Sequence, residues 1–145
     1  MSKKLYISNS LDYTPIQMML MSEFCVFCMQ HLPVEGDVKI LVVDNREDHG
    51  ISTTGVYHIG EGLLKIYAKN RALADVLRSI AHELTHMMQD EVGLIQGPVQ
   101  DAGGFHEDQA NAKAGEIIKL FAKSKPERKK IYESVLAKML LASLT

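Results

Sequence analysis

The segment from Arg71 to about Asp90 carries the strongest structural signal in the chain. Its apolar side chains recur at the spacing of an α-helix: Leu73, Val76, Leu77, Ile80, Leu84, Met87 and Met88. This periodicity predicts a long amphipathic helix, which must bury its apolar face against another element. Asn70 stands just before the segment and is the expected N-cap residue.

The sequence His82-Glu83-Leu84-Thr85-His86 lies in the middle of this predicted helix. A four-residue step turns a side chain by about 400°, so His82 and His86 project from one face about 40° apart. Leu84 belongs to the apolar face, and His82 is rotated from it by about 200°. We therefore expect both imidazoles to point into a cleft, where their nitrogens can share one metal ion.

A second helix is predicted from about Phe105 to Lys123, after a loop rich in glycine. Glu107 and Asn111 lie four residues apart on one face of this helix. Ala110 and Ala114 share that face, and their small side chains would let the two helices approach closely. Glu107 is the expected third metal ligand.

The alternatives for this third ligand are His106 and Asp108, because both adjoin Glu107. A further alternative is that Glu107 only interacts with the dipole at the helix start. Asn111 is expected to accept a hydrogen bond from the outer N–H of His82, which would fix the tautomer of that ring.

Two imidazoles and one carboxylate, with a fourth position open to water, suit zinc best among the divalent ions. Bound zinc lowers the pKa of its water and polarises a scissile carbonyl group. Glu83 lies between the two histidines in sequence but is displaced from the metal. We expect it to be the general base that takes the proton of this water and passes it to the leaving amine.

The N-terminal half predicts one helix and several strands. A strand is expected over Lys4–Ser8, and a helix that ends near Gln30 is expected to begin with Thr14 as cap, Pro15 in the first turn and Gln17 closing a capping box. The remaining strands are expected over residues 38–43, 53–59 and 63–68, the last two joined by the hairpin linker Gly60-Glu61-Gly62.

A C-terminal helix is expected to begin with Ser124 as cap, Pro126 in the first turn and Glu127 closing a capping box. Its apolar face would consist of Ile131, Val135 and Met139. Together these elements predict an α+β fold, and the length of 145 residues predicts a single domain over residues 1–145.

Composition narrows the class of protein. With 46% apolar residues the chain can bury a core, so disorder is not expected. The net charge of −2 argues against a protein that coats nucleic acid, although the basic cluster Lys123, Lys125, Arg128, Lys129 and Lys130 could contact an acidic partner. The N-terminus lacks a signal core and no run is long enough to span a membrane, which predicts a cytoplasmic protein without membrane contact.

Cys25 and Cys28 stand three residues apart within the first helix, near His31. Two cysteines cannot form a disulfide scaffold, and reduced thiols suit the cytosol. The three residues could bind a second metal ion, but their apolar neighbours favour a place in the core.

The motif His82–His86 and the later Glu107-Asp108-Gln109-Ala110-Asn111 together resemble the gluzincin metallopeptidases. In that clan two histidines of one helix and a glutamate of the following helix bind zinc. Among the small gluzincins the chain looks most like the ImmA/IrrE-type group, which has a strand running into Ala-His-Glu-Leu-x-His and a later Glu-x-x-Ala-Asn. The resemblance covers roughly residues 55–119 and implies a small zincin-like domain.

The resemblance also implies how substrate would bind. Gluzincins pair an extended peptide with an antiparallel edge strand before the metal helix, and by its order in the chain Thr53–Ile59 resembles that strand. A protein or peptide substrate would then add as a further strand. Tyr57, His58 and His106 are the candidates for oxyanion or substrate contacts.

The resulting hypothesis is a zinc-dependent endopeptidase. The alternative is a zinc-containing binding or regulatory domain with little or no turnover, in which a side chain such as His106 closes the fourth metal position.

Overall fold

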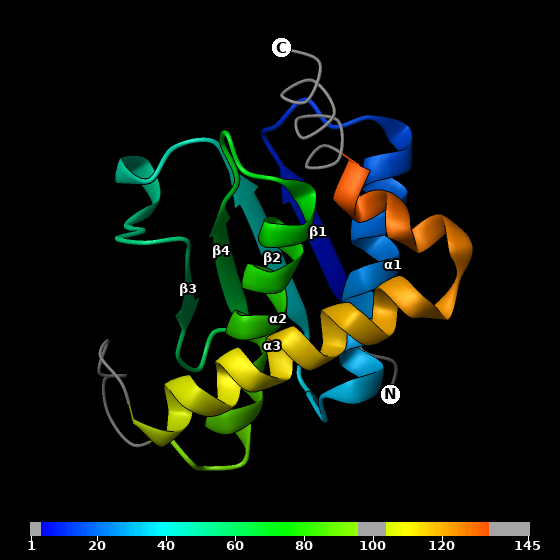
Figure 1. The fold of residues 1–145 in the computed structure, drawn as a ribbon. Coiled ribbons are helices and arrows are strands. Elements are labelled where there is room, and N and C mark those ends of the chain that lie inside the picture. The colour runs from blue at the N-terminus through cyan, green and yellow to red at the C-terminus, as the bar shows by residue number, and fades with distance from the viewer. Residues whose placement is uncertain (1–3, 96–103, 134–145) are drawn as a thin grey trace.

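The computed structural model describes residues 4–95 and 104–133, whose elements confirm the predicted α+β class (Figure 1). Two short 3-10 helices, η1 and η2, cover Glu47–His49 and Pro126–Tyr132. The strands and α-helices follow the order β1 (Leu5–Asn9), α1 (Pro15–His31), β2 (Val38–Val43), β3 (Gly55–His58), β4 (Leu63–Tyr67), α2 (Leu73–Glu91) and α3 (Phe105–Ser124).

The described strands form one mixed sheet in the order β1-β2-β4-β3. β1, β2 and β4 are parallel, and α1 supplies the crossover that a parallel β1–β2 pair requires. β3 runs antiparallel to β4 at the edge of the sheet, with Tyr57 opposite Leu64. The structure thus confirms the predicted antiparallel edge strand.

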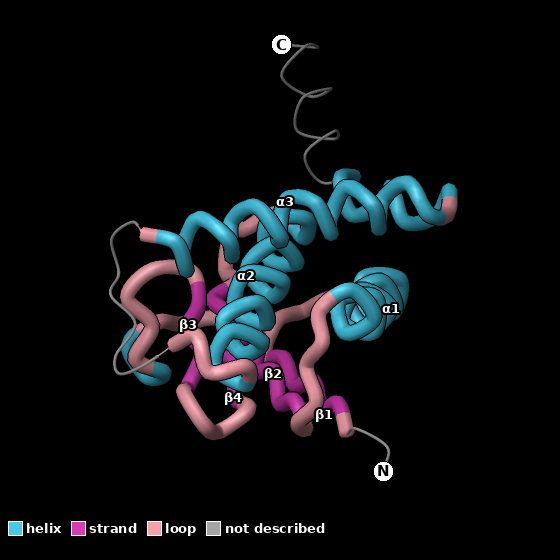
Figure 2. Tube along the Cα trace, turned by 90° about the horizontal axis from the view of Figure 1, so that it is seen from below, coloured by secondary structure: helices cyan, strands magenta, loops and turns pink. Residues whose placement is uncertain are grey.

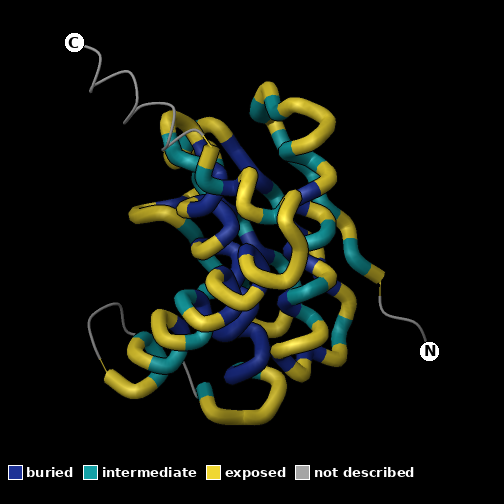
Figure 3. The backbone as a smooth tube through the Cα atoms, turned by 45° about the vertical axis from the view of Figure 1, so that its right-hand side comes forward, coloured by how far each residue is buried: buried dark blue, intermediate teal, exposed yellow. Residues whose placement is uncertain are grey.

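The helices cover one face of this sheet (Figure 2). α1 and α2 lie against the sheet, and α3 crosses α2 on the side away from the strands. In β4, Leu64 and Ile66 point into the buried layer, whereas Leu63, Lys65 and Tyr67 are only half-buried. Buried backbone accordingly gathers in the middle of the molecule (Figure 3). At the α1–α3 contact the rings of Phe24 and Phe121 meet edge to face, 5.1 Å apart.

α1 begins with the predicted capping box. The backbone N–H of Gln17 donates to the Thr14 hydroxyl at 3.2 Å, and the Gln17 side chain accepts from the Thr14 N–H at 2.9 Å. These two bonds satisfy backbone donors that the first helical turn leaves without partners.

The linker of the β3–β4 hairpin contains two glycines, Gly60 and Gly62. Gly60 and Gly62 both have positive φ, at 78° and 61°. A Cβ at Gly62 would also overlap the carbonyl oxygen of Asp37, whereas a Cβ at Gly60 would meet nothing within 4 Å. The predicted linker therefore has one glycine required by its backbone angle and one required by packing as well.

Two predicted helix caps are wrong. Asn70 has φ 60° and lies in the turn before α2, whose N-cap is Ala72 without a side-chain bond. Ser124 does not cap the following segment, because its hydroxyl donates to the Phe121 carbonyl at 2.6 Å. That segment begins as the 3-10 helix η2, with Lys125 as N-cap.

η2 still buries Ile131 as the apolar periodicity predicts. Val135 and Met139 lie outside the described residues. Among the residues that are described, no helix combines the length and apolar character needed to cross a membrane.

Candidate metal centre

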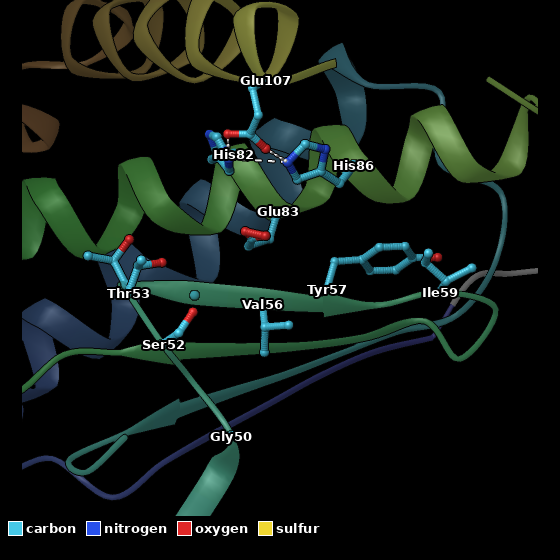
Figure 4. A pocket seen from close by; sticks show the side chains of 12 residues that line it. Gly50, Ser52, Thr53, Val56, Tyr57, Ile59, His82, Glu83, His86 and Glu107 are labelled. Carbon is cyan, nitrogen blue, oxygen red and sulfur yellow. Dashed lines mark hydrogen bonds and ion pairs between the residues drawn. The ribbon is translucent and has the colours of Figure 1, made fainter. Parts of the chain in front are cut away.

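α2 and α3 bring the three predicted metal ligands together (Figure 4). His82 and His86 project from one face of α2, and Glu107 projects toward them from the first turn of α3. Ala110 and Ala114, on the predicted helix face, are buried. One ligand atom from each of His82, His86 and Glu107 lies within 4.8 Å of the others, so the three residues could hold a metal ion.

The separations of these ligand atoms fit a tetrahedral ion. With metal–ligand bonds of about 2.0–2.1 Å, adjacent ligand atoms of a tetrahedron lie about 3.3 Å apart. The Nε2 atoms of His82 and His86 are 3.2 Å apart, and His82 Nε2 lies 3.3 Å from Glu107 Oε2. His86 Nε2 and Glu107 Oε1 lie 2.6 Å apart, closer than two ligands of one tetrahedral ion, so binding of an ion would move them apart.

Gln89 orients the ring of His86 through a hydrogen bond to its Nδ1 atom. Its side chain is fully buried, and its amide nitrogen donates to the His106 carbonyl at 3.0 Å and to Gln109 Oε1 at 2.8 Å. Because a backbone carbonyl can only accept, the amide oxygen must face His86 Nδ1, 2.8 Å away. Nδ1 therefore carries a proton, which leaves Nε2 as the ring nitrogen that can bind a metal ion.

Burial and the neighbouring His86 lower the pKa of His82, although Glu107 and a side-chain hydrogen bond with Asn111 act in the opposite direction. The lowered pKa favours the neutral imidazole, which is the form that binds metal. Asn111 thus stands beside His82, where the sequence predicts it.

Glu83 points from α2 toward β3 (Figure 4). It is buried, and this burial raises the pKa of its carboxyl group to about 7, with His86 lowering it and Glu107 raising it further. Gly55 of β3 forms the opposing wall: an added Cβ there would lie 3.2 Å from Glu83 Cγ. A general base operates best with a pKa near the working pH, and Glu83 has this property.

The three candidate ligands His82, His86 and Glu107 are called the ligand cluster below. A hollow of about 330 Å³ lies between this cluster and β3. His82, Glu83, His86 and Glu107 line one side of it, and residues of the segment 50–59 line the other. A second hollow, of about 440 Å³, continues along α2 and shares Thr53, Thr54, His82, Glu83 and Glu107 with the first. The cluster thus lies where two hollows meet, as the prediction of a cleft requires.

The outer edge of β3 has free backbone groups. Tyr67 N donates to Thr54 O at 3.0 Å, which fixes the alternation of bonded pairs in this antiparallel ladder. The N–H and C=O groups of Gly55 and Tyr57 consequently face away from β4. No described strand pairs with that edge.

The three candidates for oxyanion or substrate contacts lie in different places. Tyr57 lines the first hollow, but its hydroxyl donates to Asp90 Oδ2 at 2.6 Å, and its ring extends along β3 away from Glu107. His58 faces Glu61 at 3.4 Å. His106 contributes its carbonyl to Gln89, and within the described part of the chain neither histidine lines the hollows.

The other predicted clusters do not form sites in the described residues. Cys25 and Cys28 are free and buried in the core, as their apolar neighbours indicate, and His31 is exposed and close to the Phe27 carbonyl. Burial raises the pKa of Cys25 to about 12.

Arg128 differs from the lysines of the predicted basic cluster in being engaged by other side chains. Arg128 lies over the Phe121 ring, 4.3 Å from its centroid, and pairs with Glu23 at 3.4 Å. This contact separates Arg128 from the exposed lysines around it.

Sequence reasoning did not identify Gln89, which hydrogen-bonds to His86, as part of the site. It also did not identify Arg71 and Arg78, which line the second hollow. Gln89 follows His86 by three residues, which is the spacing of neighbours on a helix, and this was the available signal. Arg78 precedes His82 by four residues and so shares the face of the histidines.

Comparison with the models of known protein families and with curated protein sequences gives no match to this chain.

Proposed function

We propose that this chain is a zinc-dependent endopeptidase that hydrolyses an extended segment of a protein or peptide. The observation that carries the proposal is the position of Glu83, a buried carboxylate beside His82, His86 and Glu107 in a hollow that borders an edge strand. The resemblance to gluzincins of the ImmA/IrrE type supports the same reading.

The ligand chemistry supports zinc as the ion. His82 and His86 would each supply Nε2 and Glu107 a carboxylate oxygen, which is a ligand set of catalytic zinc sites. When bound, zinc supplies an acidified water molecule and polarises the carbonyl group of the substrate. Gln89 keeps the lone pair of His86 directed toward the ion.

Glu83 is placed to move the proton. Its burial keeps the carboxylate basic, so it can accept a proton from the attacking water and return it to the leaving amine. The outward N–H and C=O groups of Gly55 and Tyr57 would hold an extended peptide beside the ligands. Free, buried cysteines agree with a reducing compartment, so we place the protein in the cytoplasm.

The test compares the zinc-loaded wild type with Glu83→Gln, using a library of protein-derived peptides and mass spectrometry to detect new termini. We expect the wild type to cleave and Glu83→Gln to retain zinc without cleaving. Glu116→Gln, an exposed change of the same kind on α3, serves as the control and should cleave normally. Cleavage by Glu83→Gln at the wild-type rate would remove Glu83 from the role of base.

A second function is favoured by one observation, the engagement of the Tyr57 hydroxyl by Asp90. With this hydroxyl turned away, the described part of the hollow has no assigned donor for an oxyanion. A zinc-containing binding or regulatory domain would bind peptides from the same library, and neither the wild type nor Glu83→Gln would cleave them.

A further inference from the structure

The hollow along α2 differs in character from the hollow beside β3. Every residue that lines it is polar: Thr53, Thr54, Arg71, Asp75, Arg78, Ser79, His82, Glu83, Glu107 and Asn111. Such a surface offers little to an apolar side chain, because burying polar groups without partners is unfavourable. The ligand of this hollow is expected to carry hydrogen-bonding or charged groups.

Arg71 is fixed in the wall of this hollow by its own bonds. Its guanidinium donates to the Tyr67 carbonyl at 2.6 Å, to the Asp75 carbonyl at 3.1 Å and to the Ser79 hydroxyl at 2.8 Å. The group is half-buried and remains charged, so it contributes a fixed positive charge close to the ligand cluster.

Arg78 lines the same hollow but, unlike Arg71, is not held by bonds to described residues. It is exposed, and its side chain has neither an ion pair nor a hydrogen bond with any residue that the structure describes. It lies one helical turn before His82, on the same face of α2. Glu83 and Glu107 line the end of the hollow at the metal centre, and away from that centre the wall carries two arginines and one carboxylate, Asp75.

We infer that this hollow is a subsite for a carboxylate group of the substrate, with Arg78 as the residue that binds it. The inference rests on the proposed function, because the carboxylate is one attached to a peptide that lies across the metal ligands. A planar guanidinium can donate two parallel hydrogen bonds to a carboxylate, which makes arginine well suited to this recognition. The carboxylate can belong to an acidic side chain or to the end of a peptide.

The experiment uses peptide hydroxamates, which attach to the metal of the full-length, zinc-loaded protein whatever their sequence. The first pair, amidated at the C-terminus, differs only by aspartate or asparagine next to the hydroxamate-bearing residue. The second pair carries asparagine and differs only by a free or an amidated C-terminus. Calorimetry gives the dissociation constants for the wild type, Arg78→Gln and Lys119→Gln, the last being an exposed control outside both hollows with the same loss of charge.

We expect the wild type to bind at least one carboxylate-bearing member about tenfold more tightly than its neutral partner. Arg78→Gln should abolish this preference while binding the neutral members within about twofold of the wild type. Lys119→Gln should retain the preference. The pair that shows the effect identifies the source of the carboxylate.

Equal binding within both pairs, or a preference that survives Arg78→Gln, would overturn the carboxylate subsite and leave the proposed peptidase intact. If no hydroxamate binds to the zinc-loaded wild type, the open metal position is missing. In that case the proposed function fails, and the subsite fails with it.

Discussion

Gln89 accepts a hydrogen bond from His86 at 2.8 Å, and this contact determines which ring nitrogen faces Glu107. The first prediction concerns its loss. Gln89→Leu should weaken zinc binding by about 10- to 100-fold, because the ring of His86 loses the partner that fixes its tautomer. Competition with a chelator of known affinity measures this change.

Gln109→Leu is the matched control, because it removes one partner of Gln89 without touching His86. It should lower the free energy of unfolding to a modest extent and leave zinc affinity close to that of the wild type. If both variants weaken zinc binding equally, the effect comes from the packing of α2 on α3 and not from the tautomer.

Gly55 allows β3 to approach Glu83, which leads to the second prediction. An added Cβ would lie 3.1 Å from a methyl carbon of Ile66, 3.2 Å from Glu83 Cγ and 3.3 Å from the Lys65 carbonyl oxygen, so Gly55→Ala must shift these neighbours or β3 itself. We expect normal zinc content and a cleavage rate lower by about 10- to 100-fold, because the base is misplaced. Gly115→Ala, which meets nothing within 4 Å, should cleave as the wild type does. An unchanged rate in Gly55→Ala would show that Glu83 keeps its position and that the other neighbours yield.

The two hairpin glycines should differ in their contribution to stability. Gly60→Ala should lower the free energy of unfolding by about 1–2 kcal/mol, which is the cost of positive φ in a residue with a Cβ. Gly62→Ala should lower it by clearly more, since its Cβ would also overlap the Asp37 carbonyl. Urea denaturation of both variants gives the comparison, and equal losses would mean that the hairpin shifts to accommodate the methyl group.

The buried thiols predict a pH dependence of stability. Burial raises the pKa of Cys25 from 9.0 to about 12 and shifts Cys28 in the same direction. The folded state therefore favours the neutral thiol, and this contribution to stability is complete below pH 9 and is lost as the pH rises toward 12.

Two measurements check this prediction. Iodoacetamide at neutral pH should leave both cysteines of the folded chain unmodified, because the thiolate is the reactive form, and should alkylate them in urea. The Cys25→Ala variant should lose less stability than the wild type between pH 9 and pH 11. Rapid alkylation of the folded protein would contradict the burial of these residues.

The sequence could predict the elements whose signals are local. The period of the apolar residues identifies α2, and the spacing of His82 and His86 places both on one face. The capping box of Thr14 and Gln17 involves residues three positions apart, so it can be read directly. Glu107 could be predicted because its helix follows α2 closely in the chain.

What could not be predicted depends on contacts between distant segments. The hydroxyl of Tyr57 donates a hydrogen bond to Asp90, which lies thirty-three residues later, and no local sequence pattern predicts that bond. Gln89 acquires its role only because α3 presents the His106 carbonyl to it. Asn70 has the side chain of a cap, but the turn after β4 places it in a left-handed conformation before the helix begins.

The convergence of His82, His86 and Glu107 on one ion is the central claim, and the zinc content of purified protein tests it most directly. After dialysis against metal-free buffer, elemental analysis should find one zinc per wild-type chain and per chain of Asp108→Asn, in which an exposed neighbouring carboxylate is removed. Glu107→Gln should retain far less than one. A wild type without zinc, or a Glu107→Gln variant with as much zinc as Asp108→Asn, would contradict the claim.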